Sequence, residues 1–176
     1  MPMKRIFLLL ALLPLFAPAL RAQDVRKHYT SLATEKGTLY FVYPRKLAAT
    51  GASGGKASLP FDLTYLTSAD SLSFTVSLRV AGSGAVDSVH VVAPDGAQLS
   101  VVPERIYVDA RRSGYEHRLR FGIPFEAARR LYEGASPYVL RFFTADGVCA
   151  YAFKAGAWNK ERAVMRRIFG IFEMNR

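Results

Sequence analysis

Residues 71–80 alternate without a break between apolar and polar side chains, and this pattern constrains the fold more than any other in the chain. The apolar positions are Leu72, Phe74, Val76, Leu78 and Val80. Successive side chains of a strand point to opposite faces, so the pattern predicts a strand with one apolar and one polar face. Sheets with one wet face are usually antiparallel. We therefore expect this strand at the centre of a β-sandwich or barrel-like core.

Similar alternating runs, separated by turn residues, occur on both sides of this strand and predict eight or nine strands in all. The runs lie at 38–43, 61–66, 86–92, 98–102, 105–110, 115–121, 138–143 and 148–153. Hairpin turns are indicated by Pro94-Asp95-Gly96 and by Asp146-Gly147. Pro44 is expected to end the first run, and residues 45–56, with glycines at 51, 54 and 55, are expected to form a loop.

Two segments change to helical spacing. Residues 125–133 predict a short crossover helix that Gly134 ends. Residues 158–175 predict an amphipathic helix with a broad apolar face, in which Glu161 is the single charged misfit. The predicted fold is mainly β: an antiparallel β-sandwich or partly open barrel with one short crossover helix and a C-terminal amphipathic helix.

The beginning of the chain resembles a secretory signal peptide. Lys4 and Arg5 precede a run of about fifteen apolar residues, and small residues follow at Ala17, Ala19 and Ala22. The run contains two prolines and is short for a membrane span, which needs about twenty residues. We expect cleavage after Ala22 and export to the periplasm or the medium. The single cysteine and the absence of an Asn-x-Ser/Thr site favour a bacterial protein.

Residues 23–176 then form one predicted domain. The segment 1–22 carries three basic and no acidic residues, so the formal net charge of +10 falls to +7 without it. A domain of this size buries about two-thirds of its unfolded surface and needs no disulfide. Cys149 is alone and lies in an apolar strand pattern, so we expect it to be buried.

No motif for catalysis, metal binding or nucleotide binding is supported by its sequence context. Gly51-Ala52-Ser53-Gly54-Gly55 matches the G-x-S-x-G pattern of hydrolases, but no strand precedes it and Pro60 prevents a long helix after it. His28, His90 and His117 are too widely separated to suggest a metal site. His90 is expected to face solvent, and His117 to be a hydrogen-bonded core or rim residue. We expect no cofactor.

Basic residues provide the one functional signal. The candidate anion-binding residues are Arg111, Arg112, Arg118, Arg120, Arg166 and Arg167. Arginine binds phosphate and carboxylate groups in a bidentate way, and a strongly basic domain favours polyanions. Because export disfavours nucleic acid as a partner, an anionic component of the cell envelope is the expected anion.

The sequence leaves three hypotheses for function. The first is an exported, non-catalytic binding or assembly module of a cell envelope or secreted complex, with a protein partner. The second is a binder of membrane headgroups or acidic polymers that uses the arginines and the C-terminal helix in peripheral contact. The third is a small hydrolase whose site is assembled from separate strands.

Overall fold

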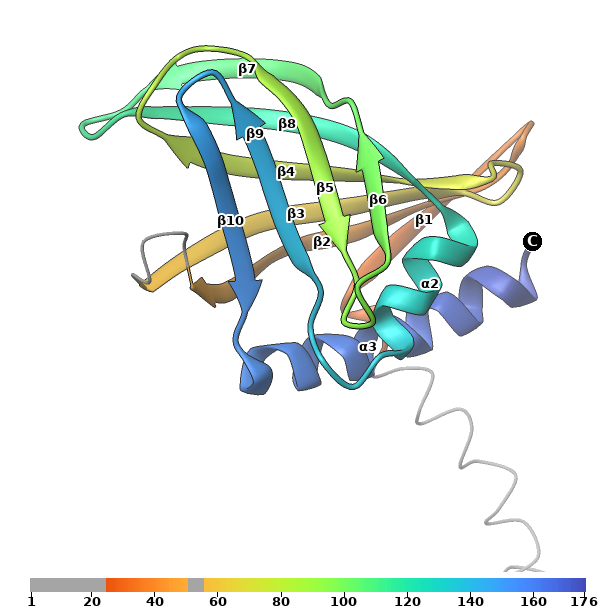
Figure 1. Cartoon of the computed structure of the whole chain (residues 1–176). Coiled ribbons are helices and arrows are strands. Elements are labelled where there is room, and N and C mark those ends of the chain that lie inside the picture. The colour runs from red at the N-terminus through yellow and green to blue at the C-terminus, as the bar shows by residue number, and fades with distance from the viewer. Residues whose placement is uncertain (1–24, 51–55) are drawn as a thin grey trace, which may run out of the picture.

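Ten antiparallel strands and two helices make up the part of the chain that the computed structural model describes, residues 25–50 and 56–176 (Figure 1). The strands are β1 (Tyr29–Thr34), β2 (Gly37–Thr50), β3 (Lys56–Leu66), β4 (Ser71–Val80), β5 (Val86–Val92), β6 (Gln98–Val101), β7 (Glu104–Ala110), β8 (Tyr115–Pro124), β9 (Val139–Thr144) and β10 (Gly147–Phe153). The helices are α2 (Phe125–Glu133) and α3 (Ala155–Met174). The predicted fold class is confirmed.

One continuous sheet bends into two layers. The order of hydrogen-bonded strands is β6-β5-β9-β10-β2-β3-β4-β8-β7, and β1 adds to β2 beside this path. In Figure 1 the strands β10, β9, β5 and β6 form the steep front layer, and the strands from β2 to β7 cross behind them. The layers join where Ala152 and Phe153 of β10 pair with Thr50 and Ala49 of β2. The result is a partly open barrel.

A chain corner joins the two ends of this strand path. β6 pairs with β5 in the front layer, and β7 pairs with β8 in the rear layer, yet only Val102 and Pro103 separate β6 from β7. Proline has no N–H to donate, so it suits a position where a strand leaves one ladder for another. The two edges of the barrel, β6 and β7, are therefore connected by the chain itself. Within the described residues no hydrogen-bonded ladder joins them.

The strand predicted to be central lies between β3 and β8, with the expected face in the core. Leu72, Phe74, Val76 and Leu78 are all at most 1% exposed. The rings of Phe74 and Phe121, which are paired across β4 and β8, stack with their centroids 5.8 Å apart. Period-2 patterning thus places the apolar faces of several strands in one common interior.

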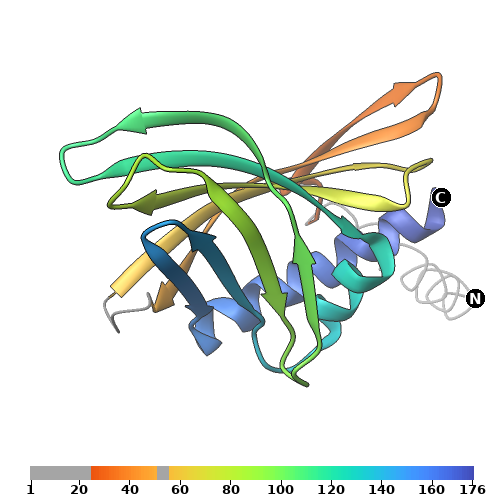
Figure 2. The same ribbon diagram turned by 45° about the horizontal axis from the view of Figure 1, so that its top comes forward.

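The helix α3 lies across the open lower side of the barrel (Figures 1 and 2). Its buried side chains are Trp158, Glu161, Met165, Ile168, Phe169 and Phe172. Phe172 packs against Tyr40 of β2 and Tyr65 of β3, with centroids 4.9 and 4.8 Å away. The apolar face of this helix is therefore part of the core. No helix in the described residues is long and apolar enough to cross a bilayer.

The prediction that a strand ends at Pro44 is wrong. The prediction of a loop at 45–56 is wrong for residues 45–50 and for Lys56, which lie in strands. β2 continues to Thr50, because a register shift between Val42 and Arg45 takes Pro44 out of the ladder with β3. Beyond this bulge, Leu47 and Ala49 point into the core. Residues 51–55, which belong to the same predicted loop, lie outside the described residues.

The predicted count of eight or nine strands is also too low, because the polar segment before residue 37 forms β1. Five of the six residues of β1 are exposed, and the strand pairs with the first half of β2 from Tyr29↔Val42 to Thr34↔Gly37. Figure 2 shows this hairpin extending beyond the rest of the sheet. Because β1 buries so few side chains, its sequence lacks the apolar alternation from which a strand can be predicted.

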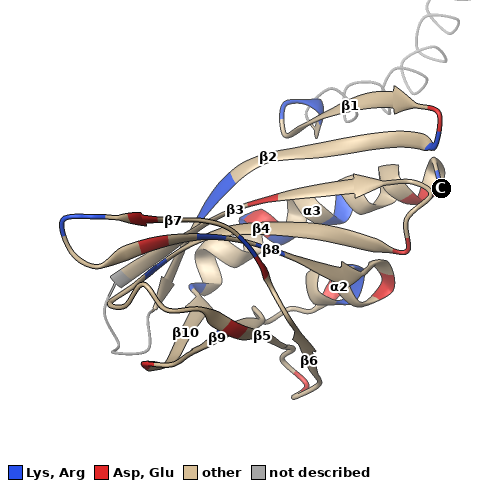
Figure 3. Ribbon diagram, turned by 90° about the horizontal axis from the view of Figure 1, so that it is seen from above, with Lys and Arg blue, Asp and Glu red and all other residues tan. Residues whose placement is uncertain are grey.

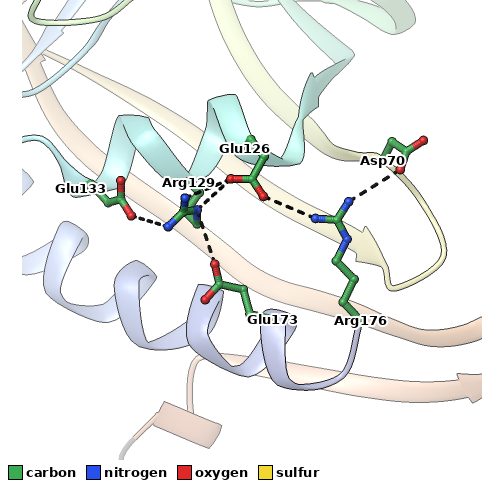
Figure 4. Close-up of polar contacts among 6 residues, drawn as sticks. All are labelled: Asp70, Glu126, Arg129, Glu133, Glu173 and Arg176. Atoms are coloured by element: carbon green, nitrogen blue, oxygen red, sulfur yellow. Dashed lines mark hydrogen bonds and ion pairs between the residues drawn. The ribbon is translucent and has the colours of Figure 1, made fainter.

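The two helices are tied together by ion pairs. Arg129 of α2 contacts Glu126 at 3.0 Å, Glu133 at 2.7 Å and, across the helix interface, Glu173 of α3 at 3.4 Å (Figure 4). Arg176 contacts Glu126 at 3.5 Å and Asp70 of the β3–β4 turn at 3.7 Å. Single exposed pairs stabilise little, and together these pairs connect α3 to α2 and to the β3–β4 turn.

Candidate functional site

The six predicted arginines do not form a single patch. Arg111 and Arg112 lie in the β7–β8 turn, Arg118 and Arg120 on β8, and Arg166 and Arg167 on α3. In Figure 1 the strand β7 is at the top of the molecule and α3 at the bottom. Figure 3 shows that basic and acidic residues are scattered among one another over the ribbon. The arginines therefore form separate groups.

The turn and helix arginines are on the surface. Arg111 contacts Asp109 at 3.3 Å and Glu116 at 3.1 Å. Its hydrogen bond lowers the pKa of the Glu116 carboxyl below the usual range. Arg112, Arg166 and Arg167 are exposed. Since Arg166 and Arg167 lie on the outer side of a helix whose apolar face is buried, they have no exposed apolar face beside them.

Arg118 and Arg120 belong to a shallow groove on the outer face of the rear layer. The groove has a volume of about 610 Å³, and its lining residues are Phe41, Asp62, Thr64, Ser73, Thr75, Ile106, Tyr107, Arg118 and Arg120. These residues come from β2, β3, β4, β8 and β7, which lie in this order in the sheet. On β2, β3, β4 and β8 alternation places them together, because they occupy the outward positions of strands whose inward positions form the core. Ile106 and Tyr107 of β7 are consecutive exposed residues at the register shift between Arg105 and Tyr107.

Charges in the groove are held in a defined arrangement. Arg118 forms an ion pair with Asp62 and donates a hydrogen bond of 3.0 Å to the Ser77 hydroxyl. Arg120 lies 3.5 Å from Glu104 and is half-exposed. The groove therefore presents carboxylate oxygens that accept hydrogen bonds beside guanidinium groups that donate them.

Aromatic rings and hydroxyl groups complete the lining. Phe41 on β2 and Tyr107 on β7 come from opposite sides of the groove and are 39% and 40% exposed. Between them lie the hydroxyl-bearing residues Thr64, Ser73 and Thr75, of which Thr75 is buried. Polar side chains between exposed rings form a surface that can bind a ligand with both hydroxyl groups and apolar edges.

Sequence reasoning identified the two arginines of this groove and missed its other residues. Asp62 and Phe41 are outward-facing positions in alternating runs, and that signal was available. What could not be read from the sequence is the order β2-β3-β4-β8-β7, which brings positions as distant as 41 and 120 to one face.

The histidine and cysteine positions agree only in part with expectation. His117 is fully buried, and its Nε2 lies 3.0 Å from the Gly82 carbonyl oxygen, so its prediction as a hydrogen-bonded core residue is confirmed. His90 lies on the outer face of β5 as predicted, because its neighbours Val89 and Val91 are buried; its ring packs on Phe143 at 4.2 Å and its Nδ1 lies 2.8 Å from the Gln98 amide nitrogen. Cys149 is half-buried and not buried as expected, because it lies two residues after Gly147, near the turn of the β9–β10 hairpin, and burial raises its pKa.

A second polar cluster lies inside the barrel. Glu161 of α3, the misfit of the helical pattern, is 5% exposed, and its Oε1 lies 3.5 Å from Nε of Arg45 on β2. Neither atom has a hydrogen-bond partner among the described residues, and the same holds for the buried Nε1 of Trp158. Nearby, the hydroxyls of Tyr132 and Tyr138 lie 3.4 Å apart, and burial raises the pKa of both tyrosines. A buried ion pair of this kind costs desolvation energy that its attraction offsets only in part.

The stability of the fold is expected to depend on pH through Glu161. Burial raises the pKa of its carboxyl above 4.5, although Arg45 opposes the shift. The folded protein then binds the Glu161 proton more tightly than the unfolded chain does. Protonation of Glu161 therefore adds stability that is complete below about pH 4.5 and is lost as the pH rises through the raised pKa. Relative to Glu161→Gln, the free energy of unfolding of the unsubstituted protein should therefore increase as the pH falls from neutral.

Urea denaturation at a series of pH values measures this difference. The same comparison for Glu35→Gln, at an exposed glutamate, gives the baseline. A difference that favours the unsubstituted protein at higher pH would contradict the prediction, because attraction to Arg45 would then outweigh the cost of burial.

No family model, no curated protein and no solved structure matches the chain. Within residues 25–50 and 56–176, no three His, Cys, Asp or Glu side chains are grouped so that they could hold a metal ion. Ser53 and its glycine-rich segment lie outside the described residues.

Proposed function

We propose that this chain is an exported, non-catalytic binding module that binds an acidic polysaccharide of the cell envelope in the groove on its outer face. The observation that carries the proposal is the grouping of Arg118, Arg120 and Asp62 between the exposed rings of Phe41 and Tyr107. The signal-like segment 1–22 supports export, and the net charge of the remaining chain supports an anionic ligand.

The chemistry of the groove favours a sugar polymer over a simple anion. Sugar hydroxyls both donate and accept hydrogen bonds, and the groove offers an Asp62 carboxylate, two guanidinium groups and side-chain hydroxyls within one lining. The apolar C–H face of a sugar ring can pack on an exposed aromatic ring. A carboxylate on the sugar would bind the half-exposed Arg120, which keeps donors that its pair with Glu104 does not use.

Two substitutions in the groove are expected to weaken this binding. Arg120→Gln removes the guanidinium donors and Phe41→Ala removes an exposed ring, and each should reduce affinity for polygalacturonate about tenfold, as expected for the loss of a charged hydrogen bond or of a ring contact. Affinity electrophoresis in gels that contain polygalacturonate, neutral dextran or poly-glutamate measures the effect. Retardation by polygalacturonate should exceed that by either of the other polymers.

Arg166→Gln is the matched control, because it changes the net charge by the same amount at an exposed position on α3. If Arg166→Gln weakens binding as much as Arg120→Gln, attraction depends on net charge alone and the proposal fails. Equal retardation by poly-glutamate would likewise contradict a saccharide ligand.

A further inference from the structure

A second cavity lies where the two edges of the barrel separate. From the corner at Val102 and Pro103, β6 runs back along the front layer, while β8 continues along the rear layer toward α2 (Figure 1). Leu99 of β6 and Ile123 of β8 both line a cavity of about 370 Å³ in this gap. Within the described residues β6 pairs only with β5, so the edge of β6 that borders the gap has no strand beside it.

The walls of this cavity are mainly apolar. Val91 and Ile123 are at most 2% exposed, and α2 adds Ala127 and Leu131 on the opposite side. The volume falls within the range of small-ligand pockets, about 300–1,000 Å³. The cavity is too small for a folded partner and suits a short aliphatic chain.

The polar side chains of the lining differ in their hydrogen bonds and ion pairs. Asp95 accepts a hydrogen bond of 2.9 Å from the Ala97 amide, and the Gln98 amide nitrogen lies 2.8 Å from Nδ1 of His90, so both are held within the β5–β6 hairpin. Arg130 of α2 is the third polar residue of the lining. It is exposed and forms no ion pair with any residue that the structure describes.

The neighbouring residue on the same helix shows the opposite arrangement. Arg129 lies next to Arg130 on the same helix and contacts three carboxylates, Glu126, Glu133 and Glu173 (Figure 4). The acidic residues around α2 are thus paired with Arg129. The carboxylate in the cavity lining, Asp95, accepts a hydrogen bond from the Ala97 amide and forms no ion pair with Arg130 among the described residues. An apolar cavity with one unpaired cation at its rim is complementary to an apolar anion.

We propose that this cavity binds a small aliphatic carboxylate, whose chain lies between β6 and α2 and whose carboxylate pairs with Arg130. Val91, Leu99, Ile123 and Leu131 contact the chain, and burial of its methylene groups contributes about 0.8 kcal/mol each. Arg130 supplies two parallel donors to the carboxylate. This site is separate from the groove on the outer face and does not depend on its function.

Calorimetric titration with decanoate tests the proposal on the protein obtained by expressing the full chain. Arg130→Gln should weaken decanoate binding about tenfold and leave binding of 1-decanol, which has the same chain without the charge, nearly unchanged. Ala127→Phe, which places a ring in the cavity, should abolish binding of both. Arg112→Gln, at an exposed arginine in the β7–β8 turn, is the matched control and should bind decanoate normally.

Absence of decanoate binding at millimolar concentration would overturn the proposal. Binding that Ala127→Phe does not affect would also overturn it, because the ligand would then lie elsewhere. If Arg130→Gln and Arg112→Gln weaken binding equally, Arg130 has no specific role and the proposed pairing is wrong. Melting curves of each variant establish that it is folded before the titration.

Discussion

Removing residues 157–176 is expected to abolish the cooperative unfolding of the protein. The truncated chain loses nearly all of α3, and with it five large apolar side chains of the core, Trp158, Met165, Ile168, Phe169 and Phe172. Full burial of one such side chain contributes about 1.5–3 kcal/mol. Five of them together are comparable with the whole net stability of a domain, about 5–15 kcal/mol. Near-UV circular dichroism during thermal melting measures the loss.

A chain that lacks only Asn175 and Arg176 is the matched control. It loses the ion pairs of Arg176 with Asp70 and Glu126, which are exposed and contribute little, so it should melt cooperatively. If the chain ending at Gly156 melts like the full-length protein, α3 is not part of the core. Should only the full-length protein then sediment with anionic vesicles, the membrane-headgroup hypothesis would replace the groove as the explanation of function.

The Trp158→Ala variant is expected to lose about 3–5 kcal/mol of stability, the range for removal of a large aromatic side chain from a core. Trp158 is fully buried. Its ring stacks on Tyr132, with centroids 5.3 Å apart, and meets Tyr138 edge-on at 5.2 Å. Because these partners come from α2 and from the segment before β9, the resulting cavity would loosen three elements at once. Chemical denaturation of the variant and the unsubstituted protein measures the difference.

Met174→Ala tests whether such a loss is specific to the buried face of α3. Met174 is 77% exposed on the same helix, so its substitution should change stability by less than about 0.5 kcal/mol. A loss of less than about 1 kcal/mol for Trp158→Ala would mean that the tryptophan is not packed as described.

Alternation and helical spacing predicted the parts of the fold that bury a continuous apolar face. The strand β4 and the helix α2 have the bounds that the sequence predicts, because each presents an unbroken pattern that ends at a turn residue. The helix α3 begins at Ala155, earlier than predicted, since Ala155 and Gly156 carry no apolar signal.

The errors have a common physical cause. β1 is exposed and the second half of β2 buries alanine as well as leucine, so neither shows strong contrast between its faces. Pro44 ends a strand in most settings, but here a bulge accommodates it. Glu161 interrupts the apolar face of α3, and only the folded chain shows Arg45 opposite it.

Only the part of the candidate site that lies on one strand could be predicted from the sequence. Arg118 and Arg120 share a face because they are two residues apart on β8. Phe41, Asp62 and Tyr107 join them through strand order, which depends on the packing of the whole chain. A sequence pattern defines the faces of each strand and leaves the neighbours of that strand open.

The two-residue link between β6 and β7 limits how wide the barrel can open. From Val101 to Glu104 the chain makes three Cα–Cα steps, which reach about 11 Å when fully extended. At that end the two edges cannot separate further, whereas at the other end of the gap the much longer segment that contains α2 connects β8 to β9. Residues inserted after Val102 would lengthen this tether without breaking any strand pairing, so the length of this short link limits the width of the gap at the corner between the two layers.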